Sequence, residues 1–268
     1  MESGFKDING AELFYERKGT GRTVVFIHGF SLDHRLWNPQ FDEFALQYDC
    51  LRYDMRGFGR SSLPQKKAKY SHQSDLLALL KELNVTEPVA LVGLSLGGRV
   101  AVNFTLNYPE MVSALIIADG VVDGFDYRHM NFNHIYESGI KEGAQTANDK
   151  WIRHPIFEPA MKNNESAALL TEMLTGYSGW HWANRNPIAA PADKPDAIER
   201  LHEINAPTLI VLGENENKDF IEVAEIMNAG IPHSEKIYIS GAGHISNLEQ
   251  PEEFNKIVLS YLKRTLQN

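Results

Sequence analysis

The sequence predicts an α/β fold: a doubly wound, mostly parallel sheet with helices on both faces and one helical insertion. Short continuous runs rich in Val, Ile and Leu alternate along the chain with helix-like segments, and such runs are typical of strands that are buried on both faces. A length of 268 residues also suits a single α/β core with an insertion. Helical connections between successive strands imply parallel pairing.

The chain opens with a predicted β-hairpin. Residues 5–17 contain two strand-like runs around Asn9-Gly10, a pair that accepts the positive φ angles of a tight turn. This hairpin is expected to form an antiparallel edge of the sheet. The other predicted strands are residues 23–27, 50–53, 89–92, 114–118, 208–212 and 236–239. The helices predicted between and after them are residues 33–48, 71–83, 96–108, 219–229 and 251–266.

The alternation stops at about residue 123 and resumes near residue 201. The segment between has no strong strand run, but residues 130–140, 146–154 and 165–175 have a composition and spacing compatible with helices. We therefore expect a core of residues 1–122 and 201–268 and a helical cap of residues 123–200. Since ligands bind outside the carboxyl edge of an open α/β sheet, the cap is expected over that edge.

Charge and composition narrow the choice of partners. The chain has 26 Lys and Arg against 35 Asp and Glu, a formal net charge of -9, which disfavours nucleic acid and anionic membranes and favours a small, neutral substrate. The single cysteine, Cys50, gives no sign of an oxidising compartment. The first residues lack the pattern of a secretory signal, and no apolar run approaches the ~20 residues that span a bilayer. We expect a cytoplasmic protein and leave its oligomeric state open.

The strongest local motif is Gly93-Leu94-Ser95-Leu96-Gly97, directly after the strand predicted at 89–92 and before a helix. A sharp turn from strand to helix strains the backbone of the serine, and flanking glycines remove side chains that would collide there. The context indicates that Ser95 is a nucleophile. The alternative interpretation is a glycine-rich turn whose serine caps the helix.

A serine hydroxyl needs a general base that is itself oriented by a third group. His244 follows the strand predicted at 236–239 and lies in a glycine-containing loop, which would place it at the same sheet edge as Ser95. The alternative is a histidine of a surface loop. Three carboxylates compete as the orienting acid, because Glu216, Asp219 and Asp119 all follow predicted strands. The chain order of serine, acid and histidine suits all three and does not choose among them.

Acyl transfer also requires donors for a developing oxyanion, and the expected pair is the backbone N–H groups of Phe30 and Leu96. His28 and Asp54, which follow the strands predicted at 23–27 and 50–53, are interpreted as structural hydrogen-bonding residues. The sequence contains no GxxxxGK[ST], GxGxxG or HExxH motif, so neither a nucleotide cofactor nor a metal is expected.

Five segments follow one another in a characteristic order. They are HGF at His28, DMRGFGRSS at Asp54, GLSLGG at Gly93, PTLIVLGENE at Pro207 and GAGHISNLEQPEEF at Gly241. Together they resemble the α/β-hydrolase superfamily, in particular its cap-bearing, lipase-like bacterial members, over essentially the full chain. The resemblance implies a hydrolase with a Ser-His-acid triad and no cofactor. It places the acid three residues after Gly213, at Glu216, where most relatives carry aspartate.

The expected function is hydrolysis of a small carboxylic ester or lactone through an acyl-enzyme on Ser95. The resemblance equally permits a carbon-carbon bond hydrolase or a perhydrolase, and a second class of function is a small-molecule receptor or signalling protein with vestigial hydrolysis. The predicted cap is rich in aromatic residues, which either line an acyl pocket or pack against one another. These are Phe125, Tyr127, Phe132, Tyr136, Tyr177, Trp180 and Trp182.

Overall fold

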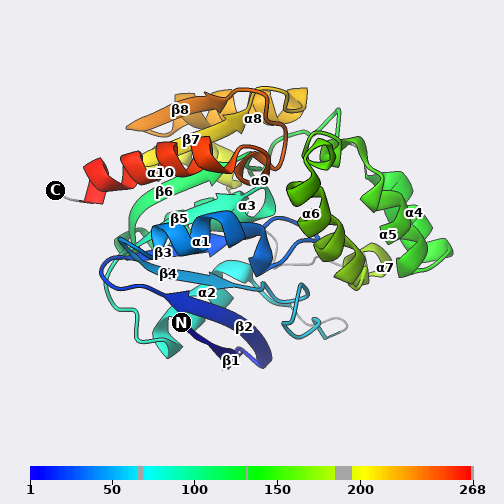
Figure 1. The fold of residues 1–268 in the computed structure, drawn as a ribbon, viewed down its shortest axis with the longest axis horizontal. Helices are drawn as coiled ribbons and strands as arrows, with labels where there is room; N and C mark the ends of the chain where they lie inside the picture. The colour runs from blue at the N-terminus through cyan, green and yellow to red at the C-terminus, as the bar shows by residue number, and fades with distance from the viewer. Residues whose placement is uncertain (66–68, 131, 185–194, 267–268) are drawn as a thin grey trace.

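The chain folds around an eight-stranded sheet with helices on both faces, as a computed structural model shows for residues 1–65, 69–130, 132–184 and 195–266 (Figure 1). The strand order is β1-β2-β4-β3-β5-β6-β7-β8. Strands β1 and β2 form the antiparallel hairpin, and β2 also pairs antiparallel with β4. The remaining neighbours pair in parallel. The predicted α/β class and its antiparallel edge are confirmed.

The strands lie where the apolar runs predicted them. Their bounds are β1 (Glu2–Ile8), β2 (Ala11–Lys18), β3 (Thr23–Ile27), β4 (Asp49–Tyr53), β5 (Val89–Leu94), β6 (Val112–Ala118), β7 (Thr208–Gly213) and β8 (Ser234–Ile239). Asn9 and Gly10 turn the hairpin with φ angles of 52° and 75°, as the Asn-Gly signal predicts. The central strands β5 and β7 are buried at every residue, while the edge strands β1 and β8 are partly exposed.

The helices agree with the prediction in number and place around the sheet, but several short ones were not predicted. The α-helices are α1 (Asn38–Phe44), α2 (His72–Glu82), α3 (Leu96–Asn107), α4 (Asn133–Lys141), α5 (Ala144–Ile152), α6 (Asn164–Gly176), α7 (Trp180–Ala183), α8 (Lys218–Gly230), α9 (Ser246–Glu249) and α10 (Pro251–Leu266). The 3₁₀ helices are η1 (His34–Trp37), η2 (Pro109–Met111), η3 (Pro155–Phe157), η4 (Ala160–Lys162), η5 (Ala197–Glu199) and η6 (Leu201–Glu203). The helix predicted at 33–48 is divided into η1 and α1, because Pro39 opens a new helix there.

Two helical layers cover the sheet. Helices α1 and α10 contact each other on the face toward the viewer, and α2 and α3 contact each other on the opposite face (Figure 1). Their apolar sides close over the buried strands and form one continuous core. Among the described helices, none combines the length and the apolar character needed to traverse a bilayer.

Helices α4 to α7, called the cap helices below, gather at one end of the sheet, at the right of Figure 1. They correspond to the three helices predicted at 130–140, 146–154 and 165–175, with the four-residue α7 in addition. The division into a core of residues 1–122 and 201–268 and a cap of residues 123–200 stays a prediction. Part of that cap range, residues 131 and 185–194, lies outside the described residues.

Candidate active site

Ser95 occupies the tight turn between β5 and α3. Its φ of 54° and ψ of −113° lie outside the helical and extended regions, a backbone strain that non-glycine residues keep mainly at functional sites. Helix α3 begins very close to the neighbouring strand, since a Cβ on Gly97 would lie 2.1 Å from the carbonyl oxygen of Ile27. Glycine is therefore required for the approach that presents Ser95 at the carboxyl end of β5.

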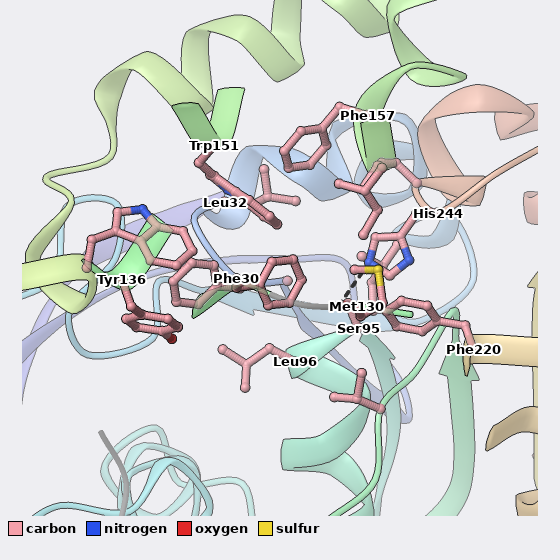
Figure 2. Close-up of a pocket in the computed structure, with 17 residues that line it drawn as sticks. Phe30, Leu32, Ser95, Leu96, Met130, Tyr136, Trp151, Phe157, Phe220 and His244 are labelled. Carbon is pink, nitrogen blue, oxygen red and sulfur yellow. Dashed lines mark hydrogen bonds between the residues drawn. The ribbon is translucent and has the colours of Figure 1, made fainter. Parts of the chain in front are cut away.

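His244 lies in the loop between β8 and α9 and contacts Ser95, which stands 149 positions earlier in the chain. Its Nε2 is 3.0 Å from Ser95 Oγ, and its Nδ1 is 2.5 Å from Glu216 Oε2 (Figure 2). An ionised carboxylate only accepts hydrogen bonds, so Nδ1 carries the proton and Nε2 is left to accept one from the serine hydroxyl. His244 and Glu216 are both buried.

The carboxylates that chain order left open lie in different surroundings. Glu216 follows β7 and contacts the imidazole of His244. Asp219, in the first turn of α8, accepts the backbone N–H groups of His129 and Met130 at 2.7 and 2.8 Å. It therefore fastens the segment that leads into α4 and does not orient the imidazole.

Asp119 ends β6 and is fully buried, with an unusual φ of 44°. Its Oδ1 accepts the Gly213 N–H at 2.8 Å, and its Oδ2 accepts the Ser246 hydroxyl at 2.5 Å. Gly213 is the last residue of β7, three positions before Glu216, and Ser246 lies two positions after His244. Asp119 therefore joins the two loops that carry Glu216 and His244.

Glu249 is a further buried carboxylate of this region, and the sequence analysis gave it no role. Its two oxygens accept the backbone N–H groups of Gly243 and Ile245 at 2.6 and 2.9 Å. These are the residues on either side of His244, so Glu249 fixes the backbone that carries the imidazole. The sequence marks Glu249 only as an acidic residue five positions after His244, within the segment GAGHISNLEQPEEF that resembles the α/β-hydrolase superfamily.

The charges around His244 make it a stronger base than an ordinary histidine. Burial disfavours the charged imidazolium and lowers the pKa of His244. The charge and hydrogen bond of Glu216, together with Asp119 and Glu249, outweigh burial and raise this pKa above its usual value. Burial and the charge of Glu216 also raise the pKa of Asp119 well above that of an ordinary aspartate.

Phe30 and Leu96, the two residues predicted to supply oxyanion donors, line the same cavity as Ser95. Leu96 is the first residue of α3, so its N–H has no partner within the helix. Neither backbone N–H has an acceptor among the residues that the structure describes. The Phe30 carbonyl accepts the Ser31 hydroxyl at 2.5 Å, and the same hydroxyl accepts the Trp151 indole N–H at 2.6 Å. This second contact, which was not predicted, ties helix α5 to the Phe30 loop.

A cavity of about 180 Å³ opens beside Ser95 and His244, and its lining is almost entirely apolar. Figure 2 shows His244, Phe220 and Met130 at one end of it and Tyr136 at the other. The core contributes the ring of Phe30, which lies edge-on to Trp182 at a centroid distance of 4.9 Å. Aromatic side chains of the cap helices and the segments beside them complete the wall, namely Phe132, Tyr136, Trp151, Phe157 and Trp182.

The aromatic residues noted in the sequence thus divide into two groups. Phe132, Tyr136 and Trp182 line the cavity. Phe125, Tyr127, Tyr177 and Trp180 lie outside its lining. Tyr177 instead bonds His181 through its hydroxyl at 2.6 Å, within a buried stack of rings against Phe58. One subset therefore lines a cavity and the other packs within the protein; that the cavity holds an acyl group stays a prediction.

His28 and Asp54 have the structural roles that the sequence predicted. His28 Nε2 accepts the Met55 N–H at 3.0 Å. The carboxylate of Asp54 accepts the backbone N–H groups of His34 and Arg60 at 2.7 and 2.8 Å. Both side chains fix the loops that follow β3 and β4, and both are fully buried.

Among the described residues, Asp33, His34 and Asp54 lie close enough together to resemble a metal site. Their atoms already have protein partners. Asp54 Oδ1 accepts a hydrogen bond from His34 Nδ1 at 2.7 Å, and Asp33 pairs with the Arg35 guanidinium at 2.7 Å. Hydrogen bonds from Arg35 outweigh burial and lower the pKa of Asp33. The group is therefore a satisfied structural network, which does not need a cation.

Known proteins with the alpha/beta hydrolase fold resemble this chain in sequence and in structure. A family model described as alpha/beta hydrolase fold matches residues 22–251. A thermophilic esterase from Thermogutta terrifontis has a structure similar to this chain, with a TM-score of 0.83, 26% sequence identity and 99% of each chain covered.

Two relatives show the range of activities among similar sequences. The 3-oxoadipate enol-lactonase 1 of Acinetobacter baylyi is 26% identical over 245 residues, which cover 90% of this chain and 88% of the relative. The 2-hydroxy-6-oxononadienedioate/2-hydroxy-6-oxononatrienedioate hydrolase of Burkholderia vietnamiensis is 27% identical over 273 residues, which cover 96% of this chain and 93% of the relative.

Proposed function

This chain belongs to the α/β-hydrolase family, and we propose that it hydrolyses a small carboxylic ester or lactone with Ser95, His244 and Glu216 as its triad. The proposal is carried by one observation, the continuous chain of hydrogen bonds from Ser95 Oγ through both ring nitrogens of His244 to Glu216. A serine hydroxyl becomes a nucleophile when a base stands within hydrogen-bonding reach and a third group orients that base.

In the first half-reaction Ser95 Oγ attacks the carbonyl carbon while His244 Nε2 takes the hydroxyl proton. Glu216 holds the opposite ring nitrogen and stabilises the imidazolium that forms. The carbonyl oxygen becomes an oxyanion, and the backbone N–H groups of Phe30 and Leu96 donate to it. His244 then gives its proton to the leaving oxygen, the carbon–oxygen bond breaks, and an acyl-enzyme remains on Ser95.

In the second half-reaction water attacks the acyl-enzyme. His244 removes a proton from the water, the same two N–H groups stabilise the second oxyanion, and Ser95 leaves with the proton that His244 returns to it. The products are a carboxylic acid and, in the case of an ester, an alcohol. Side chains, backbone N–H groups and water suffice for every step.

The lining of the cavity favours a neutral, apolar acyl group. Among the described residues that line it there is no Lys or Arg to pair with a carboxylate, and burying an unpaired carboxylate is costly. The relative from Burkholderia vietnamiensis is named for dioate substrates. The apolar wall therefore supports an ester or lactone of a monocarboxylic acid over a dioate.

Hydrolysis of p-nitrophenyl butyrate tests the proposal. The wild-type protein should turn over many times, and Ser95→Ala should lose about 10⁶-fold in kcat while its circular dichroism spectrum stays unchanged. Ser3→Ala, at an exposed position on the edge strand β1, is the matched control and should keep full activity. Retained hydrolysis by Ser95→Ala, or a single turnover by the wild type, would contradict the proposal.

A further inference from the structure

A second hollow adjoins the first at His244. It shares Met130, Ile156 and His244 with the apolar cavity, so these three residues form the boundary between the two. Figure 2 shows Met130 beside the imidazole at this boundary. The hollow reaches the molecular surface, because His129 and Asn215 in its lining are exposed.

The two hollows differ in chemistry. The first is lined by aromatic and aliphatic side chains. Besides His244, which it shares with the first, and the carboxylate of Glu216, the second contains the imidazoles of His129 and His154 and the amides of Asn215 and Asn217. Imidazole and amide groups exchange hydrogen bonds with hydroxyl groups.

His154 is held with one nitrogen available. Its Nδ1 accepts the Ile156 N–H at 3.2 Å, so the proton of the neutral ring is on Nε2. Nε2 donates no hydrogen bond to any of the described residues. The ring packs against Trp151 and Phe132, with centroids 5.2 and 5.5 Å away. Burial and the neighbouring His134 and His244 lower the pKa of His154. It therefore remains a neutral donor at pH 7.

The reaction itself separates the two parts of an ester. The leaving oxygen must receive a proton from His244 Nε2, so the alcohol part lies against His244. The acyl part extends from Ser95 past the N–H groups of Phe30 and Leu96, into the aromatic cavity. The hollow beyond Met130 and Ile156 is therefore adjacent to the alcohol part.

We propose that the hollow lined by His129, His154, Asn215 and Asn217 is the leaving-group subsite. It selects esters of small alcohols that carry additional hydroxyl groups, such as glycerol, and His154 determines this selectivity. The inference rests on the ester hydrolysis proposed above. Asn217 Oδ1 already accepts the Asp219 N–H at 2.9 Å, which directs its amide NH₂ to other partners. The lining carries the carboxylate of Glu216 and, among its described residues, no Lys or Arg, so a neutral alcohol is favoured over an anionic one.

Two butyrate esters that differ only in hydroxyl groups test this assignment. Glycerol 1-monobutyrate and propyl butyrate share the acyl group, and release of butyric acid from either is followed by pH-stat titration. The wild type should prefer the glycerol ester about fivefold to tenfold in kcat/KM, the effect of one or two net hydrogen bonds. His154→Leu should lose this preference through a higher KM for the glycerol ester, with a smaller change for propyl butyrate and p-nitrophenyl butyrate.

Further variants separate selectivity from structural damage. His154→Gln keeps an N–H donor and should recover most of the preference, and Asn215→Ala should lower it by a smaller factor. His202→Leu changes an exposed histidine outside both hollows and should leave the ratio unchanged.

Three outcomes would overturn the inference. Equal kcat/KM for the two esters in the wild type would remove the subsite while ester hydrolysis stands. An equal loss on both esters in His154→Leu would make His154 a structural residue. No hydrolysis of any ester, p-nitrophenyl butyrate included, would overturn the proposed function and this inference with it.

Discussion

The loops that carry Glu216 and His244 and the helices that form the aromatic wall are held in place by different forces. Buried carboxylates fix the loops, since Asp119 and Glu249 accept hydrogen bonds from the residues around Glu216 and His244. The wall depends mainly on packing. The indole nitrogen of Trp182, for example, is buried and has no hydrogen-bond partner among the described residues. Its ring is held by contacts with Phe30 and its neighbours.

This difference separates chemistry from selectivity. Hydrogen bonds are directional and fix short distances, as a proton transfer between Ser95 and His244 requires. Apolar packing tolerates exchange of side chains of similar volume. Substitutions near the loops should therefore change the rate for every substrate, whereas substitutions in the wall should change which substrate is preferred.

After the loss of Ser95 itself, the largest effect is expected at Glu216. Glu216→Gln removes the charge that orients the imidazole and allows an amide N–H to face Nδ1, so kcat should fall about 10⁴-fold. Because Glu216 raises the pKa of His244, its loss should lower that pKa. The acid limb of the kcat/KM profile, on which activity rises as His244 deprotonates, should then move to lower pH.

Glu214→Gln is the matched control, because Glu214 lies in the same loop but is exposed and bonds Ser240 and Gly241. Its activity should stay close to that of the wild type. Asp219→Asn, which weakens the anchor of the segment before α4, should cost less than Glu216→Gln. Near-normal turnover of Glu216→Gln would exclude Glu216 from the triad.

A smaller effect, again on the loops that carry Glu216 and His244, is expected at Asp119. Asp119→Asn replaces one acceptor with an NH₂ group, which cannot accept both the Gly213 N–H and the Ser246 hydroxyl as Asp119 does. The two loops should shift slightly, and kcat should fall about tenfold to 10²-fold for all esters alike. Ser246→Ala removes only the hydroxyl contact and should cost less. A change in substrate preference without a fall in kcat would place Asp119 among the selectivity residues.

In the aromatic wall, Trp182→Leu should enlarge the cavity. We expect the ratio of kcat/KM for p-nitrophenyl octanoate to that for the butyrate to rise about tenfold, the scale of selectivity for changes in an apolar pocket. The kcat for the butyrate should change little. Trp180→Leu, in the same helix but outside the cavity lining, serves as the control. An equal loss on both esters would show that the wall also supports the chemistry.

The same two kinds of contact explain how far the sequence predicted the molecule. Apolar runs located the strands, and β3 has the predicted bounds of 23–27, because burial on both faces leaves a direct mark on composition. Their places after strands predicted that Ser95 and His244 lie at the same sheet edge, and the two side chains are in contact. Chain order left the proposed acid open among three residues, because it does not determine which way a loop carboxylate turns, and only the family resemblance favoured Glu216. The contact of Glu216 with His244 and of Asp219 with backbone N–H groups required coordinates.

The other features that the sequence did not predict also leave no local pattern in it. Helices α7 and α9 have four residues each, too few for a periodic pattern of apolar residues. The hydrogen bond between Trp151 and Ser31 joins positions 120 residues apart and leaves no local signal. The aromatic residues of the cap could not be divided in advance, since lining and packing depend on side-chain direction rather than on residue type.

The smallest expected effect concerns the backbone strain at Ser95. Ser95 has a φ of 54° and a ψ of −113°, and such a conformation costs a residue with a Cβ about 1 to 3 kcal/mol. Glycine adopts it more easily but gains freedom in the unfolded chain. Ser95→Gly should therefore be more stable than Ser95→Ala by about 1 kcal/mol in urea unfolding. Both variants lack the hydroxyl, so the difference isolates the backbone. Equal stability would mean that the strain at Ser95 is no larger than the free energy that glycine loses through its freedom in the unfolded chain, and that the loops differ from the wall mainly in their hydrogen bonds.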